Sequence, residues 1–310
     1  MGGISVRRKS PLNLSLVLLA LGVGLAVMLL VAKMGTIDPK PNITFSAVQV
    51  EPGAFFAVQV DLLATDQSMR IQSPLIREEP RVYPYGKGAV ALIPVDYRTP
   101  PGDYTLEVAV KKGDKIVHKV EQVFAVNERD FAIQKLYVSS GLLSNRDEAL
   151  WAEDCIDTGE ARAKSNTDSL WRGPFVQPLK GRITTQFGQI RYINDQESGR
   201  HSGLDIAAPL GTPVMASNNG VVVLTRFLHV TGNTVILDHG LNLFTSYSHL
   251  DRIDVEVGQQ VTKDQVIGTV GNTGFSTGPH LHWAVSIGGV FVDPHLVMQK
   301  DPTWSLAVGK

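Results

Sequence analysis

The chain has 310 residues, and its 29 basic side chains nearly balance its 30 acidic ones, giving a formal net charge of −1. This balance gives no electrostatic basis for nucleic-acid binding, which depends on a basic surface. The one cysteine, Cys155, excludes an intramolecular disulfide framework and a cysteine-rich zinc site. The length suits two domains and their connectors.

The first long apolar segment, Leu12 to Ala32, carries no charged side chain. As a helix that rises about 1.5 Å per residue, it would span a bilayer core of about 30 Å. The basic residues at 7–9 favour a cytoplasmic N-terminus. We therefore expect a cytoplasmic segment at 1–10, a single transmembrane anchor at 11–33, and all later domains on the extracytoplasmic side, periplasmic or cell-wall. A cleaved signal peptide is the alternative, but its apolar core normally has only about 7–15 residues.

Residues 41–126 contain short runs in which apolar and polar side chains alternate, such as Ala57 to Leu62 and Tyr104 to Val110. Turn-forming residues separate the runs, as at Pro100 to Asp103. This pattern predicts a small β-sandwich, and the segment 99–106 resembles the late hairpin of an immunoglobulin-like module. Because no cluster of metal ligands or nucleophiles occurs here, we expect a spacer or positioning domain. Glycan or partner binding is the open alternative.

Residues 127–173 are more polar and predict a helical or irregular connector. Asn127 to Asp130 has the composition of a helix N-terminus, so we expect a short helix over 131–136. A second helix is expected from about Arg146 to Cys155. Its acidic side chains are typical of a solvated face, and we assign them no chemistry.

Residues 174–298 predict an antiparallel β-sheet domain, which a tail at 299–310 follows. Glycines mark the turns between three apolar runs, and such punctuation is typical of antiparallel strands. The runs are Gly220 to Leu224, Asn233 to Leu237 and Leu243 to His249. The whole chain is therefore predicted to be mainly β: a transmembrane helix, a small immunoglobulin-like sandwich, a short helical connector and a C-terminal antiparallel sheet.

Histidines concentrate in this last domain, since only His118 precedes His201. Residues two apart on a strand share a face, so His280 and His282 are expected to point the same way. A second candidate string begins at His201 and ends at Asp205. Catalytic Zn²⁺ takes three nitrogen or oxygen ligands and leaves one position for water, and two such strings can supply that set. Spacing alone does not establish that the strings meet.

The remaining side chains in these strings have simpler expected roles. Thr245, Tyr247 and His249 are expected to share one face of their strand. His239 is expected to be structural, within a turn, and Trp283 is expected to cover the core or to form a wall of a groove. His229 and His295 are expected to be ordinary surface or hydrogen-bonded histidines, and His118 is expected to be a strand or turn residue in another domain.

Three motifs carry a family resemblance: His-x-x-x-Asp at His201, Tyr-x-His-Leu at Tyr247 and Gly-Pro-His-Leu-His-Trp at Gly278. Together they resemble the lysostaphin/LytM-like zinc metallopeptidases of peptidase family M23, over about residues 174–295. The resemblance extends to four further segments: Thr185 to Gly188, Asp238 to Gly240, Val255 to Val261 and Lys263 to Gly268.

The resemblance implies a small antiparallel β domain with an open groove and a role for five residues. His201, Asp205 and His282 would hold Zn²⁺. His249 and His280 would be the catalytic histidines, which orient the water and stabilise the developing oxyanion. None of the five positions departs from the family pattern.

The implied protein is a membrane-anchored zinc metalloendopeptidase that hydrolyses peptide bonds in bacterial peptidoglycan. Its expected partners are the stem and cross-link peptides and the membrane, with an envelope protein as a further candidate and no nucleic acid. Two alternatives stay open: a non-catalytic envelope scaffold or activator that keeps the fold, and an N-acetylmuramoyl-L-alanine amidase. Upstream segments cover the groove in some members, so autoinhibition by residues 41–172 is a hypothesis.

Overall fold

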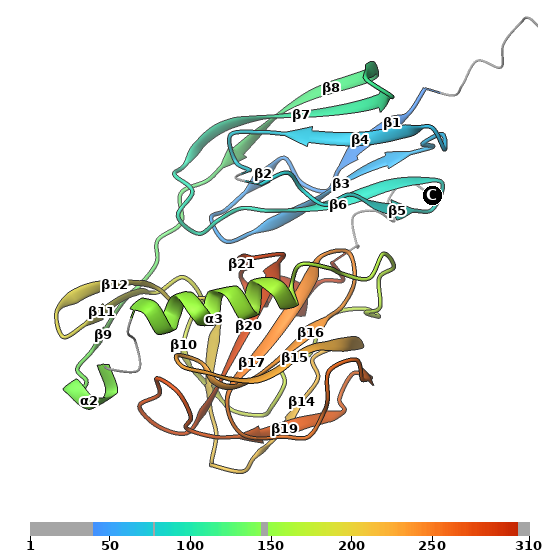
Figure 1. Ribbon diagram of the computed structural model, residues 1–310. Coiled ribbons are helices and arrows are strands. Elements are labelled where there is room, and N and C mark those ends of the chain that lie inside the picture. Colours follow the sequence, from blue (N-terminus) through green and yellow to red (C-terminus); the bar gives the residue numbers. More distant parts are fainter. Residues whose placement is uncertain (1–39, 77, 144–147, 303–310) are drawn as a thin grey trace, which may run out of the picture. The chain divides into compact units, whose positions relative to one another are not determined.

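The computed structural model describes residues 40–76, 78–143 and 148–302 (Figure 1). The predicted transmembrane segment at 11–33 lies outside these ranges. Within them, no helix is both long enough and apolar enough to cross a membrane. The described residues from Pro41 onward form one compact unit, which is mainly β as predicted.

The first part of this unit is a β-sandwich of two four-stranded sheets, with strand orders β1-β3-β6-β5 and β2-β8-β7-β4. Apolar side chains from both sheets share one core, in which Phe56 and Phe124 stack with ring centroids 4.4 Å apart. The immunoglobulin-like assignment of this sandwich stays a prediction. The strands are β1 (Asn42–Phe45), β2 (Gln49–Val50), β3 (Phe55–Asp61), β4 (Gln67–Gln72), β5 (Tyr83–Tyr85), β6 (Gly88–Pro94), β7 (Gly102–Lys112) and β8 (Lys115–Val126).

The connector contains one strand and two helices: β9 (Ile133–Leu136), α2 (Ser140–Leu143) and α3 (Glu148–Ala161). The predicted helix over 131–136 is wrong, because β9 pairs in parallel with β11 (Ile190–Ile193) in the C-terminal domain. The edge of β11 offers hydrogen-bond partners that a short isolated helix would lack. The second predicted helix is confirmed from Glu148 onward and continues beyond Cys155 to Ala161.

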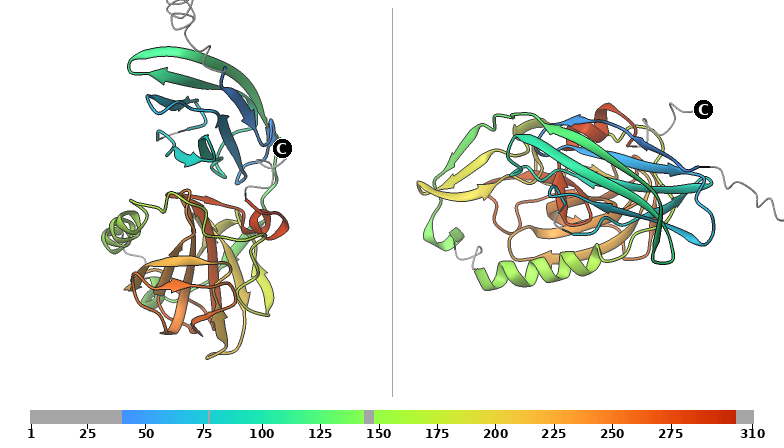
Figure 2. Two further views of the ribbon diagram at one scale, coloured as in Figure 1. Left: turned by 90° about the vertical axis from the view of Figure 1, so that its right-hand side faces the viewer. Right: turned by 90° about the horizontal axis from the view of Figure 1, so that it is seen from above.

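The C-terminal domain is built on a ten-stranded sheet whose strand pairings are antiparallel, as predicted. The main order is β10-β13-β20-β17-β16-β15-β18, and the sheet is strongly curved (Figure 2). Its strands are β10 (Arg182–Thr185), β13 (Leu204–Ala207), β14 (Pro213–Met215), β15 (Gly220–Leu228), β16 (Gly232–Asp238), β17 (Leu243–Ile253), β18 (Gln260–Val261), β19 (Val266–Val270), β20 (His280–Ile287) and β21 (Val290–Val292). A small sheet, β12 (Gln196–Arg200)-β11-β9, and helix α4 (Pro294–Gln299) complete it.

The sandwich and the C-terminal domain pack on each other through a shared apolar core. Sandwich residues such as Ala57 and Tyr83 belong to the same buried cluster as Trp283. Arg129 Nη2 lies 2.5 Å from Asp293 Oδ2, and the Tyr97 ring packs edge-on against Phe187 at 5.7 Å. The sandwich therefore supports the loop at 186–188.

Helix α3 is fixed to the turn between β15 and β16. The two carboxylate oxygens of Asp154 accept backbone N–H bonds from His229 and Val230, each at 2.9 Å. At the C-terminal end of the helix, Arg162 Nη2 donates to Ser246 Oγ at 2.8 Å.

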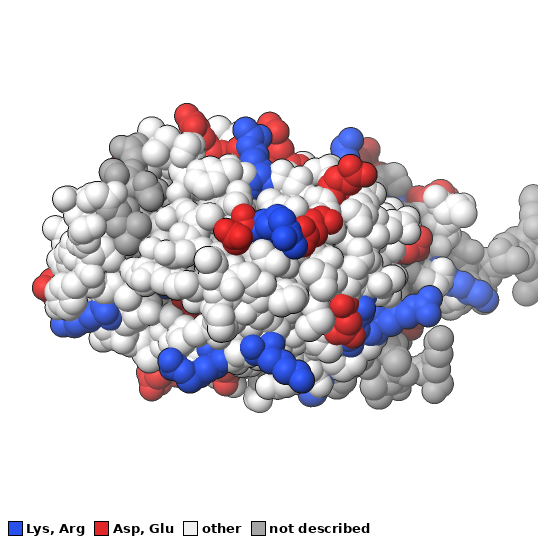
Figure 3. All heavy atoms as spheres, turned by 90° about the horizontal axis from the view of Figure 1, so that it is seen from below, with Lys and Arg blue, Asp and Glu red and all other residues white. Residues whose placement is uncertain are grey.

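Basic and acidic side chains are interspersed on the face shown in Figure 3, without a large patch of one sign.

Candidate metal centre and active site

His201, Asp205 and His282 converge at one point, although the two strings lie far apart in the sequence. Antiparallel pairing of β13 with β20 places Asp205 directly opposite His282. Asp205 Oδ1 lies 2.8 Å from His201 Nε2 and 2.8 Å from His282 Nδ1, and the two nitrogens lie 3.0 Å apart. All three residues are buried. The sheet register thus provides what the sequence spacing could not establish.

The hydrogen bonds around this cluster show that it suits a cation. His201 Nδ1 lies 3.0 Å from the Gln186 carbonyl oxygen, which can only accept, so Nδ1 carries the proton. In the neutral ring, the lone pair of Nε2 therefore faces the Asp205 carboxylate. Two acceptors this close repel each other unless a positive charge lies between them, and Zn²⁺ binds nitrogen and oxygen ligands in such a set.

The charge states of the cluster agree with metal binding. Burial alone would raise the pKa of Asp205, but His201 and His282 outweigh it and hold that pKa well below its usual range. Burial, together with the neighbouring imidazoles, lowers the pKa of His282 to about 4. At neutral pH the site therefore presents one carboxylate and a neutral His282, the forms that coordinate metals.

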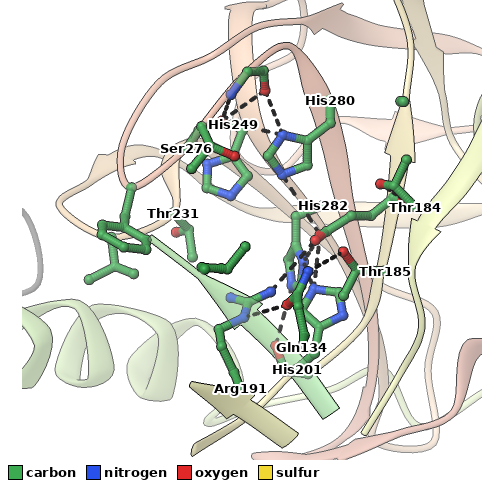
Figure 4. Close-up of a pocket in the computed structure, with 18 of the residues that line it drawn as sticks. Gln134, Thr184, Thr185, Arg191, His201, Thr231, His249, Ser276, His280 and His282 are labelled. Atoms are coloured by element: carbon green, nitrogen blue, oxygen red, sulfur yellow. Dashed lines mark hydrogen bonds and ion pairs between the residues drawn. The ribbon is translucent and has the colours of Figure 1, made fainter. Parts of the chain in front are cut away.

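His249 and His280 form a second pair beside the metal ligands (Figure 4). Their ring centroids lie 4.7 Å apart, and the His249 ring lies 6.1 Å from that of His282. His249 Nδ1 donates to the Thr273 carbonyl at 2.7 Å, and His280 Nδ1 donates to the Gly278 carbonyl at 2.7 Å. With Nδ1 as the donor, Nε2 is the nitrogen of each ring that faces the groove as an acceptor when the ring carries a single proton. Burial first, and then unfavourable interaction with the neighbouring imidazoles of His280 and His282 if they are protonated, lowers the pKa of His249 to about 3.

The side chain of His249 does not point in the direction that strand alternation predicts. Tyr247 lies opposite Trp283 on the core side of the sheet, and Ser248 lies opposite His282. Simple alternation would return His249 to the core side with Tyr247, so the prediction that they share a face is wrong. A register shift against β16 and a left-handed φ of 60° at His249 turn its ring into the groove instead.

Comparison with known proteins places this site in a family. The family model of peptidase family M23 matches residues 199–294, which include all five predicted site residues. The C-terminal domain belongs to peptidase family M23. The predicted family of metallopeptidases is thereby confirmed.

Two relatives named as endopeptidases match about two fifths of the chain. The chain is 43% identical over 127 residues to the peptidoglycan DD-endopeptidase ShyA of Vibrio cholerae, which covers 40% of this chain and 30% of that protein. It is 40% identical over 128 residues to the DD-carboxypeptidase/endopeptidase Mpg of Neisseria meningitidis, covering 41% of this chain and 30% of Mpg. The match thus spans less than a third of the length of these relatives.

A solved structure matches more of the chain. The crystal structure of a putative peptidase M23 from Pseudomonas aeruginosa has a TM-score of 0.55 at 26% identity, and covers 80% of this chain and 94% of that one. The shared fold therefore extends beyond the M23 domain into the upstream residues.

The five site residues of the M23 domain open onto a cavity of about 420 Å³. Its walls include three connector side chains, Gln134, Leu136 and Trp151. Sequence reasoning missed this contribution, because β9 reaches the groove only by pairing with β11. Trp151 could have indicated that the connector contributes to the groove. It is about half exposed on α3, and large apolar side chains at a surface often mark a binding site.

The other histidines of the M23 domain lie outside the cluster, as predicted. His239 is completely buried, with Nδ1 2.6 Å from the Asn219 carbonyl oxygen and Nε2 2.7 Å from Thr245 Oγ1. His229 lies 3.7 Å from Glu153 at the surface, and His295 Nε2 contacts Gln186 Oε1 at 2.9 Å. Trp283 is a core residue, and His118 lies on β8 of the sandwich.

Proposed function

We propose that this chain is a zinc metalloendopeptidase that cleaves peptide bonds in bacterial peptidoglycan. One observation carries the proposal: a buried His-Asp-His set whose ligand atoms converge, with two further histidines beside it in the same groove. The peptidoglycan substrate is supported by the family model, which matches the residues of this site, and by the names of the two relatives.

The chemistry follows from the donor set. His201, Asp205 and His282 would hold Zn²⁺, which polarises a carbonyl and lowers the pKa of bound water toward ~7. His249 stays neutral because burial opposes its protonation, and its Nε2 can accept a proton from the attacking water. His280 Nε2, which lies 3.7 Å from Asp205 Oδ1, can act in the same way from the adjoining position. Whichever ring takes the proton can then donate it to the leaving amine, so that the C–N bond breaks and the carbonyl carbon leaves as a carboxylate.

We further propose that the apolar segment Leu12 to Ala32 anchors the chain in the cytoplasmic membrane, with the M23 domain on the extracytoplasmic side. The charge-free length of this segment and the basic residues at 7–9 support the anchor. Peptidoglycan lies on that side of the membrane, so the proposed location and the proposed substrate agree.

Analysis of the products of digestion tests the function. The full-length chain is incubated with purified peptidoglycan beside a His249→Ala variant, with His229→Ala as a matched control at an exposed histidine. We expect cross-linked fragments to be converted to monomers that carry a new free amine at the cross-link. The His249 variant should lose this activity and the His229 variant should retain it.

The same digestion separates the alternatives. Whole stem peptides released from intact glycan would show an amidase instead of an endopeptidase. Unchanged peptidoglycan after incubation with the zinc-loaded wild-type chain would favour a non-catalytic scaffold.

A further inference from the structure

The connector segment 129–136 lies against the part of the M23 domain that carries two of the three metal ligands. Its strand β9 pairs with β11. Two of its side chains, Phe131 and Gln134, contact groups that in turn contact His201 and Asp205. The connector therefore meets the metal centre from outside, at both ligands of the His-x-x-x-Asp string.

Gln134 makes the contact on the side of Asp205. Its amide bridges two strands, because Gln134 Oε1 accepts from Arg191 Nε at 2.9 Å and Nε2 donates to Thr185 Oγ1 at 3.0 Å. Figure 4 shows Gln134 between these two residues. Thr185 lies opposite Asp205 in the pairing of β10 with β13, and Arg191 Nη2 lies 3.7 Å from Asp205 Oδ2. The bridge thus holds both neighbours of the Asp205 carboxylate.

This bridge controls which oxygen of Asp205 is left for a metal ion. Oδ1 faces the nitrogens of His201 and His282, whereas Oδ2 faces Arg191. A guanidinium has five N–H donors and can donate to either oxygen of a carboxylate, so the bond from Nε to Gln134 keeps it at Oδ2. A guanidinium released from Gln134 would be free to turn to Oδ1 and compete there with the metal ion.

Phe131 makes the contact on the side of His201. Its ring packs directly on Gly188, where an added Cβ would lie 2.0 Å from a ring carbon. The guanidinium carbons of Arg129 and Arg200 lie 4.8 and 4.9 Å from the centre of the same ring, and such cation–π contacts hold an aromatic ring in place. The Gly188 N–H donates to the His201 carbonyl at 2.8 Å. Phe131 therefore covers a loop that is bonded to a metal ligand.

The loop beneath Phe131 also sets the tautomer of the ligand ring. Gln186, two residues before Gly188, provides the carbonyl oxygen that accepts the His201 Nδ1–H at 3.0 Å. This bond leaves Nε2 as the coordinating atom and orients the ring. Loss of such outer contacts of metal-bound histidines typically lowers metal affinity about 10–100-fold. A displaced loop would therefore weaken the metal site without a change in any ligand.

We propose that the connector is part of the metal centre, with Phe131 and Gln134 as positioning residues for His201 and Asp205. The inference rests on the proposed zinc site and adds to it residues from outside the M23 domain. Linkage makes the coupling reciprocal: if the docked connector raises the affinity for zinc, bound zinc stabilises the docked connector by the same factor. This role is the opposite of autoinhibition.

Competition with a chelator of known affinity, which measures the Kd of the full-length chain for Zn²⁺, tests the proposal. Gln134→Met keeps the length of the side chain and removes both hydrogen bonds. We therefore expect a Kd about tenfold higher, at the lower end of the range for outer contacts of metal sites. Gln134→Glu keeps an acceptor for Arg191 Nε and should not weaken zinc binding. In an Arg191→Gln background Gln134→Met should have no further effect, because Gln134 acts on Asp205 through Arg191.

The second positioning residue has its own variant and control. Phe131→Leu removes the flat ring that covers Gly188 and should also raise the Kd about tenfold. Ile133→Ala is the matched control, since Ile133 lies on the same strand with a side chain that is 62% exposed. It should keep the wild-type Kd. An equal loss of affinity in Ile133→Ala would overturn the inference, because the strand would then act through its fold alone.

Hydrogen exchange of the β9 backbone amides measures the reciprocal effect. Addition of Zn²⁺ to the metal-free chain should slow their exchange, whereas the amides of β8 in the sandwich should exchange as before. Unchanged Kd values in both Gln134→Met and Phe131→Leu, or unchanged exchange of β9, would overturn the inference. Absence of zinc binding by the wild-type chain would instead contradict the proposed zinc site itself.

Discussion

Asp154 provides the sharpest test of how the connector supports the active site. Its buried carboxylate accepts the backbone N–H groups of His229 and Val230, each at 2.9 Å. Replacement by alanine leaves both donors without their acceptor, and a hydrogen bond to a charged group contributes about 1.5–3 kcal/mol. Two such bonds give about 3–6 kcal/mol, and water that enters the vacated site should keep the loss near the lower end. We expect Asp154→Ala to lower the free energy of unfolding by about 3 kcal/mol.

The same substitution should reduce catalysis, because the turn that Asp154 fixes continues into the groove. Val230 and Thr231 line the groove, and the Thr231 carbonyl accepts the backbone N–H of His249 at 2.8 Å. A looser turn should therefore lower kcat/KM on peptidoglycan fragments while the zinc content stays unchanged.

Urea unfolding followed by tryptophan fluorescence measures the loss of stability, with Asp157→Ala as the matched control on the same helix. Asp157 pairs with Arg226, whose side chain is 60% exposed, so its removal should lower the free energy of unfolding by only about 0.2–1 kcal/mol. Equal losses of stability in the two variants would refute the assigned role of Asp154.

Three further predictions concern the remainder of the unit. Burial lowers the pKa of His239 to about 4, so the unfolded chain, with a pKa of about 6.5, takes up this proton first. The contribution of His239 to the free energy of unfolding should therefore be full above about pH 6.5 and should fall as the pH drops toward 4. In His239→Asn the free energy of unfolding should depend less steeply on pH across this range. An unchanged pH dependence would contradict the lowered pKa of His239. Gly188→Ala should lower the unfolding free energy by about 3 kcal/mol, because φ is +77° and the added Cβ would overlap the Phe131 ring; Gly188→Ala combined with Phe131→Ala should recover part of the loss in thermal melting. Deletion of residues 41–172 should lower both the melting temperature and the activity, because it removes Ala57 and Tyr83 from the shared core and Gln134 from the groove. A rise in activity would instead support autoinhibition by these residues.

Local patterns predicted those features that depend on neighbouring residues alone. His280 and His282 both line the groove, while Leu281 and Trp283 lie in the core, as strand alternation requires. The turn position and structural role of His239 also follow from its neighbours. The family motif added the five site residues, and the structure brings all five together.

Features that depend on distant partners could not be predicted from local patterns. The segment 131–136 has helix-like flanks, but its conformation is set by the edge of β11, more than fifty residues later. His249 departs from alternation because β17 shifts register against β16, which no pattern within β17 indicates. Gln134 lies beside Arg191 because β9 pairs with β11, and this pairing is likewise not indicated by the residues near Gln134 in the sequence. The groove is therefore partly built by residues whose sequence carries no catalytic signal.

Zinc dependence of cleavage tests the central claim most directly. The full-length wild-type chain and a His282→Ala variant are analysed for metal content and for cleavage of peptidoglycan, before and after chelation. The structure predicts a stoichiometric metal ion in the wild-type chain, loss of cleavage on chelation with recovery on addition of Zn²⁺, and neither metal nor cleavage in the variant. Cleavage that persists in the metal-free chain, or in His282→Ala, would contradict the assignment of His201, Asp205 and His282 as the metal site.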